Sequence, residues 1–175
     1  MGETSSDLGR VANLLGAASL AVGDAVRAAT ESAAAHGAAA PAALVTLAHY
    51  PEQPIDALAR ALGLTHSGTV RLVDRLATDG LVERRRGSDA RVRAVVLTER
   101  GREASAALLD AREQALRELL APLSSAEAGA LGVALERVLG GVVDGRGSVR
   151  RICRLCDEKA CERAGADCPV AAAAR

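Results

Sequence analysis

Aromatic residues are almost absent from this 175-residue sequence, which contains Tyr50 but no Phe and no Trp. β-Sandwiches and β-barrels are usually enriched in aromatic and β-branched residues. Hydrophobic residues nevertheless make up 49% of the chain, and many of them are alanine. This composition favours closely packed helices, so we expect a mainly α fold consisting of one domain of ordinary size with a tail.

The sequence also lacks an apolar run approaching the roughly 20 residues of a membrane span. Its N-terminus does not show the basic and then apolar order of a signal peptide. These absences predict a cytoplasmic protein with no membrane partner. The formal net charge is zero, so any attraction to nucleic acid must come from a local basic surface.

No catalytic motif is recognisable. The chain shows no Ser, His and acid constellation, no phosphate loop and no pair of carboxylates in a catalytic pattern. His36 and His49 are interpreted as residues at helix ends and not as ligands. We therefore expect no catalytic residues and no enzyme.

Residues 54 to 80 contain two short helical patterns separated by a tight turn. Pro54 suits a first helical position, and Gly63 supplies the left-handed residue that ends the first helix. Thr65 is an N-cap candidate for the second helix, which carries an apolar stripe. The stripe consists of Val70, Leu72, Val73 and Leu76. The pattern predicts a helix-turn-helix whose second helix enters a major groove.

Two extended segments follow, 81–86 and 92–97, joined by the turn-forming sequence Gly87-Ser88-Asp89. They predict the hairpin wing of a winged helix-turn-helix. Positive charge is concentrated in this region, because positions 71 to 93 contain seven arginines and four acidic residues. An arginine-rich hairpin reaches phosphates or a narrow minor groove. The alternative interpretation is a solvated charge run on an ordinary hairpin.

The candidate DNA-binding residues share a position on the second helix or on the wing. They are Thr65, His66, Ser67, Thr69, Arg71, Arg75, Arg84, Arg85, Arg86, Asp89, Arg91 and Arg93.

A family resemblance becomes specific in this stretch. The segment LGLTHSGTVRLVDRLATDGLVERRRGSDARVRAVVLTERG resembles the recognition helix and wing of the MarR family of bacterial transcriptional regulators. It includes the Asp-x-Arg of the wing tip and the Leu-Thr-x-x-Gly that opens the next helix, while Gly68 departs from the hydroxyl residue common at its position. The match is sharp over 60–101 and extends over 7–143 as a helix pattern. The resemblance implies a homodimeric regulator of double-stranded DNA, and some relatives bind a small-molecule effector.

The flanking sequences predict long helices that need a partner. Apolar residues from position 8 to position 29 step by three and four, which indicates a heptad seam on one helix that Gly37 closes. The seam consists of Leu8, Val11, Leu15, Ala18, Val22, Ala25 and Ala29. A short helix opens at Pro41, a long one covers 99–121, and Ser124 with Glu127 forms a capping box for another. These helices favour a homodimer.

The expected organisation has four parts with different roles. They are an N-terminal dimerisation helix (1–40), a winged helix-turn-helix (41–98), C-terminal dimerisation helices (99–143) and a cysteine-rich tail (144–175), with a flexible hinge at 140–148.

All four cysteines lie in the tail, as Cys153, Cys156, Cys161 and Cys168 in the spacing Cys-x2-Cys-x4-Cys-x6-Cys-Pro. Four thiolates at such spacing predict a closed tetrahedral site, and zinc is expected because it tolerates this loose spacing. The terminal Cys-Pro keeps an iron–sulfur cluster as an alternative. A thiol switch, or four free thiols in a loose tail, are the remaining interpretations.

The sequence therefore predicts a dimeric, sequence-specific DNA-binding regulator, a repressor acting at a near-palindromic operator. Its four-cysteine site stabilises the dimer or senses metal or redox state. The alternative is a redox or electron-transfer protein with the cysteine cluster as its active centre. The arginine-rich wing favours the regulator, because an electron carrier does not need a basic hairpin beside a helix-turn-helix.

Overall fold

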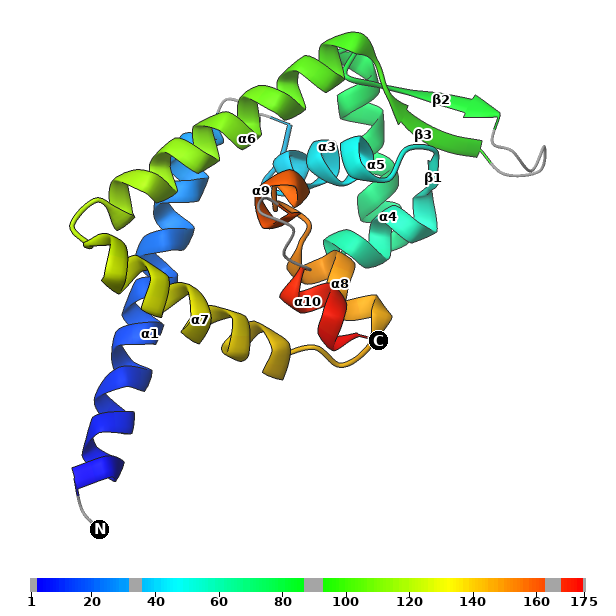
Figure 1. Ribbon diagram of the computed structural model, residues 1–175. Helices are drawn as coiled ribbons and strands as arrows, with labels where there is room; N and C mark the ends of the chain where they lie inside the picture. The colour runs from blue at the N-terminus through cyan, green and yellow to red at the C-terminus, as the bar shows by residue number, and fades with distance from the viewer. Residues whose placement is uncertain (1–2, 32–35, 87–92, 163–167, 175) are drawn as a thin grey trace.

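The computed structural model describes residues 3–31, 36–86, 93–162 and 168–174. The fold is mainly helical with a small antiparallel sheet, as the sequence predicts (Figure 1). In chain order the elements are α1 (Glu3–Ala29), α3 (Ala40–His49), β1 (Gln53–Pro54), α4 (Ile55–Leu62), α5 (His66–Thr78), β2 (Val82–Arg86), β3 (Arg93–Leu97), α6 (Glu99–Leu120), α7 (Ser125–Gly141), α8 (Arg146–Ile152), α9 (Glu158–Glu162) and α10 (Pro169–Ala173).

The hydrophobic core lies between α3, α4, α5 and the sheet. Helix α3 is buried along most of its length, from Ala40 to Leu47. Leu44 meets Leu58 of α4, Leu76 of α5 and Val95 of β3 in one cluster of buried residues. Burying such a side chain contributes about 1.5–3 kcal/mol. This core fixes the helix-turn-helix and the sheet as one unit, which we call the reader unit (residues 40–98).

The turn between α4 and α5 has the predicted geometry. Gly63 adopts a left-handed conformation with φ of 66° and ends α4. The Thr65 side chain accepts a hydrogen bond from the Gly68 backbone N–H at 3.1 Å and caps α5. Gly80, with φ of 68°, follows the end of α5. The local predictions for Gly63 and Thr65 are confirmed.

The sheet has three strands in the order β1-β3-β2. The two expected strands are present and pair from Val82 opposite Leu97 to Arg86 opposite Arg93. Strand β1 was not expected, because two residues carry no periodic signal; its Gln53 pairs with Val95. Pro54 consequently belongs to β1 and occupies the N-cap of α4, which corrects its predicted first helical position.

Helix α6 begins against the base of the wing. A Cβ on Gly101 would lie 1.9 Å from the backbone oxygen of Leu81, so only glycine permits this approach. The Thr98 hydroxyl donates to the Gly80 carbonyl at 2.6 Å and accepts from the Gly101 N–H. The Leu-Thr-x-x-Gly motif therefore ties α6 to the reader unit.

Helices α1, α6 and α7 form an outer arm that leaves the reader unit (Figure 1). Helix α1 packs against α6 but ends at Ala29, earlier than the predicted end at Gly37, and the Thr30 hydroxyl donates to the Val26 carbonyl. Much apolar surface on the arm is exposed in this single chain. The exposed residues are Leu8, Val11, Leu14, Leu15, Leu20, Val22, Leu119, Leu120, Leu131, Val133, Leu135, Val138 and Val142.

By length and composition alone, one helix among the described residues, Asp7–Ala29, is apolar enough to cross a membrane. This finding corrects the expectation that no apolar run approaches a membrane span. Alanine, leucine and valine raise the mean hydropathy of the segment, although it also contains the charged residues Asp7, Arg10, Asp24 and Arg27. A single such helix near the N-terminus is weak support for a membrane span.

The tail is more ordered than the sequence predicts. Helices α8, α9 and α10 occupy much of it, and Val170 of α10 is only 3% exposed. Helix α8 packs against α4, and α10 packs against α7 and α8. Helix α8 also begins inside the predicted hinge, at Arg146. Burial of Val170 therefore contributes to the order of α10.

Candidate DNA-binding surface and cysteine site

Helix α5 presents polar side chains on the face that points away from the core. Ser67 and Arg71 are exposed there, while Leu72 and Val73 of the same helix are buried. His66 is also exposed, and its Nδ1 donates to the Asp56 carboxylate of α4 at 2.6 Å. Thr65 is exposed beside them. These four side chains remain available for contacts with DNA.

Two other predicted contact residues of α5 already have hydrogen-bond partners within the protein. Thr69 is 0% exposed, and its hydroxyl donates to the Thr65 carbonyl at 3.0 Å. The Nε of Arg75 donates to the His36 carbonyl at 2.9 Å, so this arginine holds the connection between α1 and α3. Helical periodicity placed both residues near the polar face, but packing on α3 and its connection decided their contacts.

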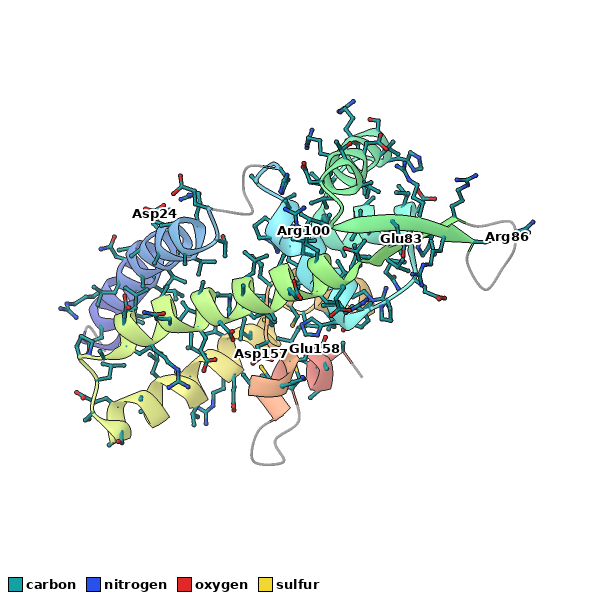
Figure 2. The ribbon with its side chains drawn as sticks, turned by 90° about the horizontal axis from the view of Figure 1, so that it is seen from above. Asp24, Glu83, Arg86, Arg100, Asp157 and Glu158 are labelled. Atoms are coloured by element: carbon teal, nitrogen blue, oxygen red, sulfur yellow. The ribbon has the colours of Figure 1, made fainter. Side chains whose placement is uncertain are left out.

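The wing carries its arginines in two groups. Arg84 is paired with Asp74 of α5 at 2.7 Å, and Arg85 is paired with Glu83 on its own strand. Arg86 and Arg93 are exposed at the outer end, and Figure 2 shows Arg86 at the far end of the wing. The predicted tip residues Asp89 and Arg91 lie outside the described residues. The ion pair between Arg84 and Asp74 connects the wing to α5, the expected reader helix, while Arg86 and Arg93 are exposed to solvent.

The four cysteines are brought to one place by the fold. Cys153, Cys156, Cys161 and Cys168 all line a cavity of about 170 Å³, together with Tyr50, Val149, Glu158 and Ala171. All four thiols are free. The cavity thus joins the ends of α8 and α10 to α9 and to the end of α3.

The thiols in this cavity interact electrostatically. A hydrogen bond between the thiols of Cys153 and Cys156 lowers the pKa of Cys156, and the positive charge of Arg112 on α6 lowers it further. The same hydrogen bond, together with burial, raises the pKa of Cys153. Burial and the neighbouring Cys156 raise the pKa of Cys161. Cys156 is therefore the most readily ionised of these three thiols.

Four thiols around one small cavity form a soft donor set of the kind that holds zinc or an iron–sulfur cluster. Within the part of the chain that the structure describes, however, no three His, Cys, Asp or Glu side chains already have the arrangement of metal ligands. The donor types and their convergence fit such a group, whereas its coordination geometry requires the side chains to close further.

Residues at the end of α3 connect the segment from α8 to α10, which we call the cysteine segment, to the reader unit. The Nε2 of His49 donates to the Cys156 carbonyl at 2.9 Å, and the Tyr50 hydroxyl donates to Glu158 at 2.7 Å. Burial and this carboxylate raise the pKa of Tyr50 to about 12. The guanidinium of Arg150 lies 4.6 Å from the centre of the Tyr50 ring. The sequence offered little sign of these contacts, because they join residues about a hundred positions apart.

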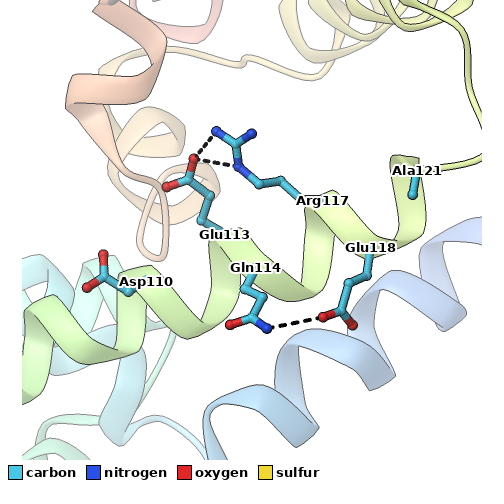
Figure 3. Close-up of a pocket in the computed structure, with 6 residues that line it drawn as sticks. All are labelled: Asp110, Glu113, Gln114, Arg117, Glu118 and Ala121. Atoms are coloured by element: carbon cyan, nitrogen blue, oxygen red, sulfur yellow. Dashed lines mark hydrogen bonds and ion pairs between the residues drawn. The ribbon is translucent and has the colours of Figure 1, made fainter.

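Two other cavities lie along α6. One of about 460 Å³ is lined by α6 alone, with Glu113 paired to Arg117 and Gln114 donating to Glu118 (Figure 3). Glu113, Arg117 and Glu118 already bond to side chains of the same helix, and we assign no candidate site to this cavity. The other, of about 440 Å³, lies where α1, α3 and α6 meet and is lined by apolar residues with His36, Arg100 and Glu103.

The geometry of the helix-turn-helix, the wing and the outer arm defines a winged helix-turn-helix protein. Residues 38–91 match the sequence model of the MarR family. Members of this family are transcription regulators and not enzymes. This finding supports the expectation of a non-enzymatic protein.

Solved structures share the fold over most of the chain. RV1404 of Mycobacterium tuberculosis is 24% identical, covers 74% of this chain and 90% of its own, and superposes with a TM-score of 0.65. A MarR family protein of Bacillus stearothermophilus is 22% identical, with 79% and 95% coverage and a TM-score of 0.64. A probable transcriptional regulator of Pseudomonas aeruginosa is 27% identical, with 73% and 98% coverage and a TM-score of 0.54. No curated protein matches the sequence.

Proposed function

We propose that this protein is a homodimeric, sequence-specific DNA-binding repressor with a structural zinc site in its tail. The observation that carries the first part is an exposed reader helix with Ser67 and Arg71, next to a wing whose outer arginines are solvent-exposed. Short polar side chains and arginine suit the base edges of a major groove, and a basic hairpin suits the backbone or the minor groove. The similarity of residues 38–91 to MarR regulators supports this interpretation.

The outer arm supports a dimer. Leu15 of α1 is 47% exposed and Leu135 of α7 is 41% exposed in the single chain. A contiguous apolar surface of this kind on a helical arm marks an interface, because exposing it to water is unfavourable. In the dimer, two copies of α5 related by a two-fold axis read successive major grooves about 34 Å apart. The matching operator is near-palindromic.

The 440 Å³ cavity supports a small-molecule effector. It adjoins both the outer arm, through Ala107 of α6, and the reader unit, through Leu44 and Leu81. Arg100 and Glu103 provide charges of opposite sign at its wall, so a small compound with an apolar body and polar groups is the chemical class that fits. A compound bound there shifts the reader relative to the arm and weakens repression.

The four-cysteine cavity supports zinc as the tail's metal. Zinc prefers four thiolates in a closed tetrahedral site with no open position. The thiolates of Cys153, Cys156, Cys161 and Cys168 would hold it, and its chemistry there is to cross-link the tail and not to catalyse. An iron–sulfur cluster and a thiol switch are the runner-up forms of the same site. An electron carrier remains the alternative function.

The test is to select binding duplexes from a random DNA pool with the purified full-length protein. The molar mass of the selected complex is then measured by light scattering. We expect a near-palindromic sequence bound by two subunits, and elemental analysis of protein prepared without oxygen should give one zinc per subunit. A monomer without DNA selectivity contradicts the regulator. Iron with labile sulfide contradicts zinc and supports the cluster.

A further inference from the structure

The cysteine segment contacts both halves of the molecule. Helix α8 packs against α4 of the reader unit, while α10 packs against α7 of the outer arm and against α8. The Cβ of Ala173 on α10 lies 3.9 Å from the position that a Cβ on Gly140 of α7 would take. Figure 1 shows α8 and α10 between α4 and the end of α7. The segment therefore spans the distance between the arm and the reader.

The cysteines lie at or near the ends of the helices in this segment. Cys153 ends α8, Cys161 lies in α9 and Cys168 immediately precedes α10. The three helices contain seven, five and five residues, and isolated helices so short are not stable in water. Linking the thiols around their common cavity fixes α8 relative to α10. The rigidity of the whole span then depends on the state of the cysteine site.

At the reader unit, the cysteine segment contacts residues 49–54, which we call the corner. Arg150 donates to the Gln53 side chain at 3.1 Å, and His49 and Tyr50 hold Cys156 and Glu158. Gln53 also belongs to β1, which pairs with β3 of the wing. The corner therefore connects α3, the wing and α4, so a displacement of the segment reaches each part of the reader unit.

We propose that the cysteine segment is a strut whose closed state holds the reader unit at a fixed angle to the outer arm. Opening the four-cysteine site frees α8 from α10 and lets the reader unit move relative to the outer arm. This movement weakens binding to an operator that fits one distance between the two α5 helices of the dimer. The physical reason is that a mobile reader must be ordered on binding, and this ordering costs affinity. The inference rests on the proposed DNA-binding regulator with a cysteine site and adds how that site controls it.

The test compares two arginines of the tail in the full-length, zinc-loaded protein. Arg150 contacts the corner, whereas among the described residues Arg154 donates to the Arg151 carbonyl in its own turn, and both are exposed. Arg150→Ala and Arg154→Ala remove the same charge, so a general loss of attraction to DNA affects both equally. We expect Arg150→Ala to keep its zinc and to weaken binding to the selected duplex about tenfold, a normal size for allosteric coupling. Arg154→Ala should stay within about twofold of wild type.

Cys156→Ser supplies the second measurement. It should weaken DNA binding by the same factor as Arg150→Ala and speed amide exchange in both α8 and α10. Equal losses in the two arginine variants, or wild-type DNA affinity in Cys156→Ser, overturn the strut. The proposed function is tested separately on the wild-type protein: it is contradicted if that protein selects no duplex or contains no zinc. Even without metal, unchanged affinity in Cys156→Ser overturns the strut.

Discussion

At the scale of single residues, Gly101 shows how a backbone contact dictates sequence. A Cβ at this position would lie 1.9 Å from the Leu81 oxygen, inside the joint between the wing and α6. Gly101→Ala should therefore lower the free energy of unfolding by on the order of 3 kcal/mol. Chemical denaturation followed by circular dichroism measures this change.

Gly129→Ala is the matched control, because Gly129 lies in α7 and a Cβ added there would meet no other side chain within 4 Å. Alanine there should raise stability by about 0.5–1 kcal/mol. Equal effects of the two substitutions contradict the close approach at Gly101.

Arg71 is the residue on α5 that we expect to read bases. Arg71→Ala should cost about 1–3 kcal/mol at one position of the operator and relax the preference there. Arg75→Ala is the control, since its guanidinium bonds to the His36 carbonyl; it should change stability and not base preference. Binding to a panel of single-base operator variants distinguishes the two. A uniform loss over the panel for Arg71→Ala assigns this arginine to the phosphate backbone.

At the scale of elements, the seam of α1 carries the expected dimer contact. Leu15→Glu places a charge in that contact, where an unpaired buried charge is strongly unfavourable. We expect monomers, or misfolded protein, and loss of operator binding, measured by light scattering. Leu20→Glu on another face of α1, where Leu20 is 72% exposed, should leave the dimer intact. A folded dimer carrying Leu15→Glu moves the interface away from the seam.

The wing is expected to supply affinity without choosing the sequence. Arg91→Ala, at the tip that the sequence predicts, should weaken binding to specific and unrelated duplexes alike. It should also make the salt dependence shallower by about one unit, since each phosphate contact contributes about 0.9 to the slope. Titrations at several salt concentrations measure this. Arg117→Ala, far along α6 and paired with Glu113, should change neither quantity; an unchanged slope in Arg91→Ala removes that residue from the interface.

At the scale of the whole molecule, the reader unit and the tail should respond differently to loss of metal. The main cluster of buried residues runs from Ala40 to Leu108 and contains no tail residue among those described. Cys156→Ser should therefore release the metal and speed amide exchange from about residue 150 onward, while the midpoint of the main unfolding transition changes little. A joint loss of the tail and the reader unit in one transition contradicts independent cores.

Much of the reader unit followed from sequence alone, because local chemistry dictates it. Gly63 ends α4 and Thr65 caps α5 through interactions within a few residues, and the two strands of the wing were recognisable as extended segments on either side of a turn-forming sequence. The capping box of Ser124 and Glu127 is equally local and is present as predicted. Such features need no knowledge of the rest of the chain.

Tertiary structure decided the features that depend on distant partners. Spacing grouped the four cysteines, but only folding placed them against Tyr50 and between α4 and α7. The sequence pattern placed Thr69 and Arg75 with the polar face of α5, but Thr69 is buried and the Nε of Arg75 donates to the His36 carbonyl. The sequence thus determined which elements form and which residues carry the chemistry. Long-range packing determined which of those residues are exposed and which elements the tail contacts, because contacts across a hundred positions leave no local pattern.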